Sequence, residues 1–166
     1  MTHGRKPRRQ GKRFVNPLQH VARQAGLHTA QELATTMAPL QHSARMLREG
    51  VATEEHHQVL YTGLLIALRI ERSGIVRGLQ EHLDAATQAM DAIGQRARAG
   101  GEWRQTALYY QELDAINTAV DLHAFQLRHL SRGELQAIVQ KLIHSTRSAG
   151  NQVQQVQPEQ LGLLAA

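Results

Sequence analysis

Six cationic side chains lie within residues 5–13, near the N-terminus of this 166-residue chain. Guanidinium and ammonium groups along an irregular segment can follow a phosphate backbone and release its counterions, with an affinity that falls as salt rises. Arginine outnumbers lysine among the six, which favours bidentate phosphate contacts. We therefore predict non-specific contact with nucleic acid, and the alternative is a solvated tail. The predicted contact residues are Arg5, Lys6, Arg8, Arg9, Lys12 and Arg13.

The segment offers charge but few other means of recognising a nucleic acid. Phe14 is the only aromatic residue close to it, so stacking on single-stranded bases is not supported. A helix-turn-helix over residues 29–53 would be followed by Glu54 and Glu55 at the start of the recognition helix, where carboxylates repel phosphate. Tethering without sequence recognition is the reading we prefer.

The ten histidines raise the question of a metal site. Glu54 and His57 have the Glu-x-x-His spacing of di-iron helical bundles, but those sites require a second such pair and two further carboxylates. The sequence contains no second Glu-x-x-His pair and no His-Glu-x-x-His motif. We therefore predict no metal and no cofactor.

No pattern of residues predicts catalysis. The sequence lacks a glycine-rich phosphate loop after a strand and a recognisable nucleophile motif. Asp114 and Asp121 share one helical face seven residues apart, as many solvated pairs do. We predict that the protein is not an enzyme.

Three further residues are candidates for contact with a partner. Trp103 is the only tryptophan, a residue type enriched in interface hot spots, although it more often closes the end of a helical core. Tyr110 directly follows Tyr109, so only one of the two can face a helix seam. His123 occupies a seam position, where we favour a buried, hydrogen-bonded histidine over a pH-sensitive interface group.

Side chains that cap helices mark the predicted helix starts. Thr29 with Glu32, and Ser131 with Glu134, have the spacing of a capping box. Thr53 precedes two glutamates, which the helix dipole favours in a first turn.

Glycine and proline mark the predicted ends and interruptions. Gly50 is a natural stop for the first helix, and Ser73-Gly74 breaks or bends the second. Pro39 lies inside the first helical pattern, where we expect it to kink or split the helix.

The clearest apolar pattern covers residues 79–97 and 109–130, where seam residues recur at spacings of four and three. Two such seams predict a helical hairpin, which turns at Gly100-Gly101 and continues in a helix that starts at Thr106. The seam residues are Leu79, Leu83, Ala86, Met90, Ile93 and Ala97, then Tyr109, Leu113, Ile116, Val120, His123, Leu127 and Leu130.

We predict an all-α fold, a helical bundle of about five helices with a long central antiparallel hairpin. The predicted divisions are a basic flexible arm over residues 1–17, the bundle over 18–149 and a loose, Gln-rich tail over 150–166. In the tail, Leu161, Leu163 and Leu164 are the side chains able to dock on the body. The extended seams also suggest a dimer that shares apolar surface between chains.

Charge is distributed unevenly along the chain. Seven of its 19 Lys and Arg residues lie in residues 1–31, which hold no acid, and the remainder carries twelve basic and fourteen acidic side chains. The positive net charge therefore belongs to the N-terminal region. The absence of cysteine excludes disulfides and fits a cytoplasmic protein. No apolar run approaches the roughly 20 residues of a membrane span, so no membrane partner is expected.

Several segments together resemble a known group of proteins. They are residues 4–9 and 12–17 of the arm, 75–79, Trp103 and 121–127. The pattern resembles small all-helical proteins of proteobacterial phages, prophages and plasmids. The resemblance implies an accessory protein of a mobile genetic element that binds nucleic acid or, alternatively, a host protein such as defence machinery.

Overall fold

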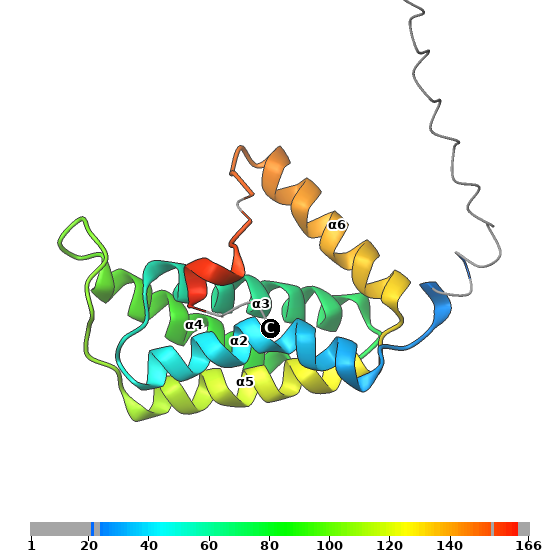
Figure 1. The fold of residues 1–166 in the computed structure, drawn as a ribbon, viewed down its shortest axis with the longest axis horizontal. Coiled ribbons are helices and arrows are strands. Elements are labelled where there is room, and N and C mark those ends of the chain that lie inside the picture. The colour runs from blue at the N-terminus through cyan, green and yellow to red at the C-terminus, as the bar shows by residue number, and fades with distance from the viewer. Residues whose placement is uncertain (1–20, 22–23, 154, 163–166) are drawn as a thin grey trace, which may run out of the picture.

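The computed structural model describes residues 21, 24–153 and 155–162, and most of them are helical (Figure 1). The helices are α2 (Ala30–Arg48), α3 (Glu54–Ser73), α4 (Gln80–Ala97), α5 (Tyr110–Arg128) and α6 (Arg132–Ser148), followed by the 3-10 turn η1 (Pro158–Leu161). The described part of the chain contains no β-strand, and one isolated bridge joins Leu27 to Ser131. The all-α prediction is confirmed.

Helices α2 to α5 lie alongside one another as a bundle, and α6 leans away from it (Figure 1). The closest-packed pair is α4 with α5, so the predicted hairpin exists. Most of its seam residues are buried between helices of the same chain, as Leu83, Met90 and Ile116 show with exposures of 0%, 0% and 1%. These seam residues pack within one chain, and the predicted dimer stays a prediction.

The predicted start of α5 and the short turn before it are wrong. Residues 98–109 form an irregular connection, and α5 begins at Tyr110 rather than at Thr106. The backbone N–H of Tyr109 donates to Glu112 Oε2 at 3.2 Å, which fixes the first turn there. Glu112 is itself held by Arg96 at 2.6 Å. Tyr109 is 54% exposed and does not join the seam.

The predicted caps are confirmed. The backbone N–H of Glu32 donates to Thr29 Oγ1 at 3.2 Å, and that of Glu134 donates to Ser131 Oγ at 3.3 Å. In turn, the carboxylate of each glutamate accepts a hydrogen bond from the backbone N–H of its capping residue. Thr53 caps α3 as expected. Helix α2 continues through Pro39 as one element, so the predicted split does not occur.

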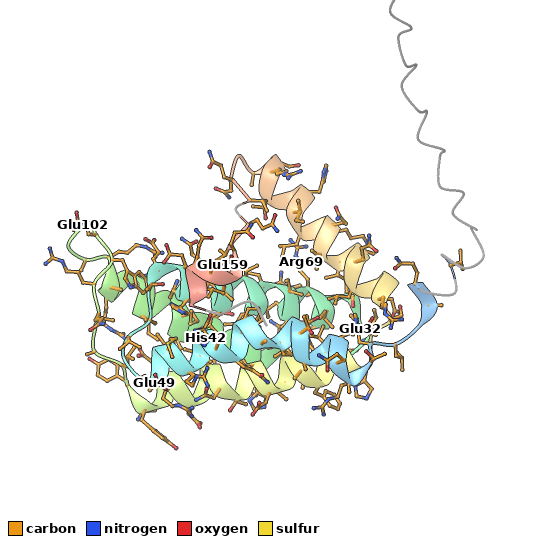
Figure 2. The ribbon with its side chains drawn as sticks, in the orientation of Figure 1. Glu32, His42, Glu49, Arg69, Glu102 and Glu159 are labelled. Carbon is orange, nitrogen blue, oxygen red and sulfur yellow. The ribbon has the colours of Figure 1, made fainter. Side chains whose placement is uncertain are left out.

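Helix α6 is attached to the bundle by few contacts. Ile138 is its only fully buried residue, and α3 is its main helical neighbour. At its start, Arg132 Nη2 lies 2.6 Å from Glu32 Oε2, where α2 and α6 meet (Figure 2). After α6 the chain returns to the bundle, and Leu161 of η1 is 3% exposed. Leu161 docks as predicted, and Leu163 and Leu164 lie outside the described residues.

Candidate ligand-binding cavity

A cavity of about 980 Å³ opens where α6 diverges from α3, within the size range of small-molecule sites. Its walls are mainly aliphatic. Helix α3 contributes Val59, Leu65 and Ile66, and α6 contributes Leu135, Leu142 and Ile143. Val153 and Val156 of the segment before η1 also line it, as do Leu40 of α2 and Leu127 of α5. The cavity follows from the loose packing of α6, whose large apolar residues other than Ile138 are only partly buried.

Polar side chains line the cavity at several places, and its charged side chains lie where α3 faces α4 together with three further polar ones. They are His57 and Tyr61 of α3 with Asp91 and Gln95 of α4, and Arg98 follows directly after α4. The Arg98 guanidinium lies 2.9 Å from Glu54 Oε1 and stacks over the Trp103 ring, with 5.3 Å to its centroid. A largely aliphatic lining whose charged groups lie together suits a ligand that is itself amphipathic.

His57 is buried at the close approach of α3 and α4. Its Nε2–H donates to the Met90 carbonyl oxygen at 2.8 Å, and burial is the main cause that lowers its pKa. The centroid of its ring lies 5.1 Å from that of the Trp103 ring and 6.1 Å from that of the Tyr61 ring. Gly94 makes room for it, because a Cβ there would lie 2.9 Å from His57 Nε2.

His56 closes the start of α3 instead of contacting the cavity. The backbone N–H of Thr53 donates to its Nδ1 at 3.1 Å, so the histidine takes the part that glutamate plays in a capping box. Its ring lies 5.5 Å from that of His42 on α2 (Figure 2). The side chain is 5% exposed, and burial lowers its pKa, opposed in part by the backbone of Leu161.

His123 lines the inner side of the cavity and is 4% exposed. Its Nδ1–H donates to Gln126 Oε1 at 3.2 Å, and Gln126 Nε2 donates to the Ala67 carbonyl at 3.1 Å. Burial lowers the pKa of His123. The favoured expectation, a buried and hydrogen-bonded histidine, is confirmed.

The structure places the other predicted residues apart from one another. The six cationic residues of the arm, 5–13, lie outside the described residues. Trp103 is half-buried, and its Nε1–H donates to the Ala52 carbonyl at 3.1 Å, so it holds the 98–109 connection against the bundle. Tyr110 is 78% exposed at the start of α5.

Glu54 and His57 are separately engaged, Glu54 with Arg98 and His57 with Met90. Over the residues that the structure describes, no three metal-ligating side chains cluster. The sequence reasoning missed His56, Tyr61, Asp91 and Gln126. Only Gln126 carried a usable signal, since it lies three residues after His123 on the same helical face.

No protein-family model matches the chain, and no curated protein or solved structure matches it. Among residues 21, 24–153 and 155–162, no helix combines the length and the apolar character needed to cross a membrane. Function must therefore be argued from the residues themselves.

Proposed function

We propose that this chain is a non-enzymatic accessory protein, of the kind carried by mobile genetic elements, that contacts nucleic acid non-specifically through its basic arm. The observation that carries the proposal is the charge distribution. Residues 1–31 hold seven cationic and no acidic side chains, whereas the remainder holds twelve basic against fourteen acidic. A polyanion would therefore be drawn to the arm in preference to the body.

Ion pairs within the body strengthen this contrast. Arg96 pairs with Glu112 at 2.6 Å, Arg98 with Glu54 at 2.9 Å and Arg132 with Glu32 at 2.6 Å. Each of these guanidinium groups already has a carboxylate partner, so its charge is partly neutralised before any phosphate approaches. This favours the arm as the phosphate-contacting element.

The residues that follow the arm are attached to the body at a defined place. The backbone N–H of Arg132 donates to the Gly26 carbonyl at 3.1 Å, and Leu27 bridges to Ser131. Residues 26 and 27 thus contact the start of α6.

Salt-dependent binding tests the proposal. Binding of labelled duplex DNA and single-stranded RNA would be measured by fluorescence anisotropy over a range of salt concentrations. Replacing Arg5, Lys6, Arg8, Arg9, Lys12 and Arg13 by glutamine should weaken binding at least tenfold. It should also reduce the slope of log K against log salt by up to about 0.9 for each lost phosphate contact. An unchanged affinity and slope would overturn the proposal.

A charge-retaining variant is the matched control. Changing Arg5, Arg8, Arg9 and Arg13 to lysine keeps the charge but removes the planar guanidinium groups. If binding is non-specific and electrostatic, this variant should keep its salt slope and lose little affinity.

A protein-binding module directed at a host protein is the second candidate, and exposed aromatic residues favour it. Tyr109 and Tyr110 are 54% and 78% exposed, and Val51 is 48% exposed. Their chain neighbours Leu108, Gly50 and Ala52 line one small cleft together with Trp103, so the three side chains share one end of the bundle. Exposed tyrosine is enriched in protein interfaces.

Capture of a partner from nuclease-treated lysate separates the two candidates. A protein partner should remain bound after nuclease digestion and should be lost when Tyr109 and Tyr110 are changed to serine. Capture that depends on intact nucleic acid, and that survives the tyrosine changes, would contradict the second candidate.

A further inference from the structure

We propose that the cavity between α3 and α6 binds a cationic aliphatic amphiphile, whose hydrocarbon chain lies between the two helices and whose head group meets Asp91. The cavity belongs to the body, so this binding does not depend on the basic arm or on the proposed function.

The lining predicts a flexible hydrocarbon rather than a flat aromatic ligand. Facing walls of the cavity are formed by branched aliphatic side chains, such as Val59 and Ile66 on α3 and Leu142 on α6. In the part of the chain that the structure describes, Tyr61 is the only phenyl ring that lines it. The volume of about 980 Å³ lies at the upper end of the range for small-molecule sites.

The polar end carries one carboxylate that lacks an ion-pair partner within the described residues. Asp91 and Arg98 are the charged side chains lining the cavity, and Arg98 is already paired with Glu54 at 2.9 Å. Asp91 lies close enough to Tyr61 to help raise the pKa of its hydroxyl, which burial raises most. The two histidines of the lining, His57 and His123, have pKa values lowered by burial and add no positive charge at neutral pH.

These charges select the sign of the head group. With Arg98 neutralised and both histidines uncharged, the local net charge is that of Asp91, which attracts a cation and repels a carboxylate. The ring of Tyr61 beside Asp91 offers a second favourable contact, since a cation over a phenol ring gains cation–π energy. An ammonium head on an aliphatic chain satisfies both ends of the cavity.

Trp103 provides a built-in reporter, because its ring lies 5.1 Å from that of His57 and it is the only tryptophan. The full chain would be titrated with octyl-, decyl- and dodecyltrimethylammonium below their micelle concentrations, with calorimetry for stoichiometry. We expect saturable binding of one molecule per chain. Affinity should rise about tenfold for every two added methylenes. Absence of saturable binding by the dodecyl compound would overturn the proposal.

Head-group selectivity is tested with dodecanoate and with two matched variants. Asp91→Asn should weaken binding of the cationic amphiphile about fivefold, as expected for one exposed charge. Asp114→Asn removes an exposed carboxylate on α5 outside the cavity and should leave binding unchanged. Dodecanoate binding as tight as that of the cation, or no effect of Asp91→Asn, would overturn the assignment of the head group.

Three further experiments test the site: a variant that fills the cavity, a competing helical peptide and a measurement of dimer formation. Thr62 is exposed and lines the cavity, so Thr62→Phe should reduce binding at least fivefold while unfolding and circular dichroism stay unchanged. A helical Leu/Lys peptide that binds when the alkyl compounds do not would point to a helical protein partner and overturn the proposal. A concentration-dependent dimer that excludes the amphiphile, seen by light scattering, would do so as well.

Discussion

Gln126 is 0% exposed, and both polar atoms of its side-chain amide are bonded, one to His123 and one to the Ala67 carbonyl. A buried polar group costs free energy unless its hydrogen bonds are made. The glutamine therefore makes it possible for His123 to occupy a position that the apolar seam would otherwise assign to a hydrophobic residue. Two polar residues three apart on α5 form one buried unit.

Changing Gln126→Leu should leave the Nδ1–H of His123 without an acceptor in the core. We expect the free energy of unfolding in urea at pH 7.5 to fall by about 1–3 kcal/mol, the usual cost of an unsatisfied buried group. Gln111 is exposed on the same helix, so Gln111→Leu is the matched control. It should change the free energy of unfolding by less than about 0.5 kcal/mol. Equal effects of the two substitutions would show that the buried hydrogen bonds are not what stabilises this position.

At the scale of elements, α3 and α4 approach closely because residue 94 is a glycine. A Cβ on Gly94 would lie 2.9 Å from His57 Nε2 and 3.0 Å from its Cε1, and that ring is held by its bond to the Met90 carbonyl. The packing of the two helices and the position of His57 therefore depend on each other.

Gly94→Ala should destabilise the protein despite the better helix propensity of alanine. The propensity gain is about 1 kcal/mol, and overpacking against a fixed ring costs about 1–3 kcal/mol, so we expect a net loss of about 1 kcal/mol in urea unfolding. Gly100→Ala is the control, because a Cβ there meets no atom within 4 Å. Stabilisation by Gly94→Ala would mean that His57 moves away at little cost.

Helix α6 should open more readily than the rest of the bundle. It contributes one fully buried residue, Ile138, whereas α3 contributes eight. Local opening is easiest where few apolar contacts are lost. In hydrogen–deuterium exchange read by mass spectrometry, amides of α6 should exchange at least tenfold faster than those of the middle of α3.

The variant Ile138→Ala distinguishes local opening from global unfolding. It should speed exchange in α6 and leave exchange in α3 nearly unchanged, because the contact it removes holds α6 alone. Equal acceleration in both helices would show that α6 unfolds together with the bundle.

The sequence predicted those elements whose signals are local. The caps at Thr29 and Ser131 depend on residues three positions apart, and both form as expected. The start of α5 was predicted too early because it depends on Glu112, which is oriented by Arg96 from the preceding helix. Pairings between helices are not visible in spacing along one helix, so such boundaries are set by tertiary structure.

In the cavity, too, features with a local sequence signal could be predicted and features set by helix packing could not. That His123 would be buried could be predicted, because it occupies a seam position. The cavity could not, because it arises from the angle between α6 and α3, and no local pattern encodes that angle. In the sequence, Asp91 cannot be distinguished from an ordinary surface acid. Its position beside Tyr61 in the cavity depends on how α4 packs against α3.

At the scale of the whole molecule, three histidines are buried in one small bundle. His56, His57 and His123 are 4–6% exposed, and burial is the main cause that lowers each pKa. Each is hydrogen-bonded in its neutral form, His56 by the backbone N–H of Thr53, His57 by the Met90 carbonyl and His123 by Gln126. Because all three imidazoles are buried and neutral, the stability of the entire bundle is sensitive to acid. As the pH falls, the histidines of the unfolded chain bind protons more readily than those of the folded chain.

Stability should therefore be constant above about pH 7.5 and fall as the pH drops below 6.5, the ordinary histidine pKa. In that range the unfolded state binds more protons than the folded state, so the free energy of unfolding decreases with falling pH. Carboxylate contributions come later, because glutamates with lowered pKa values, such as Glu32 at about 2, lose theirs only below the ordinary carboxyl pKa. Between pH 7.5 and 5.5 we expect a loss of about 1–3 kcal/mol in urea unfolding.

Removing one buried histidine should make the pH dependence shallower. The variant His123→Gln retains a polar side chain at the position but cannot titrate, so the change in unfolding free energy between pH 7.5 and 5.5 should be reduced by about a third. His82 is exposed on α4, and His82→Gln should reproduce the profile of the unmodified chain. A profile that is flat down to pH 5.5 in the unmodified protein would mean that the folded bundle accommodates these protons as readily as the unfolded chain. The buried histidines would then be hydrated or paired with acids in solution, and the assignment of His57 and His123 as uncharged groups of the cavity would no longer hold.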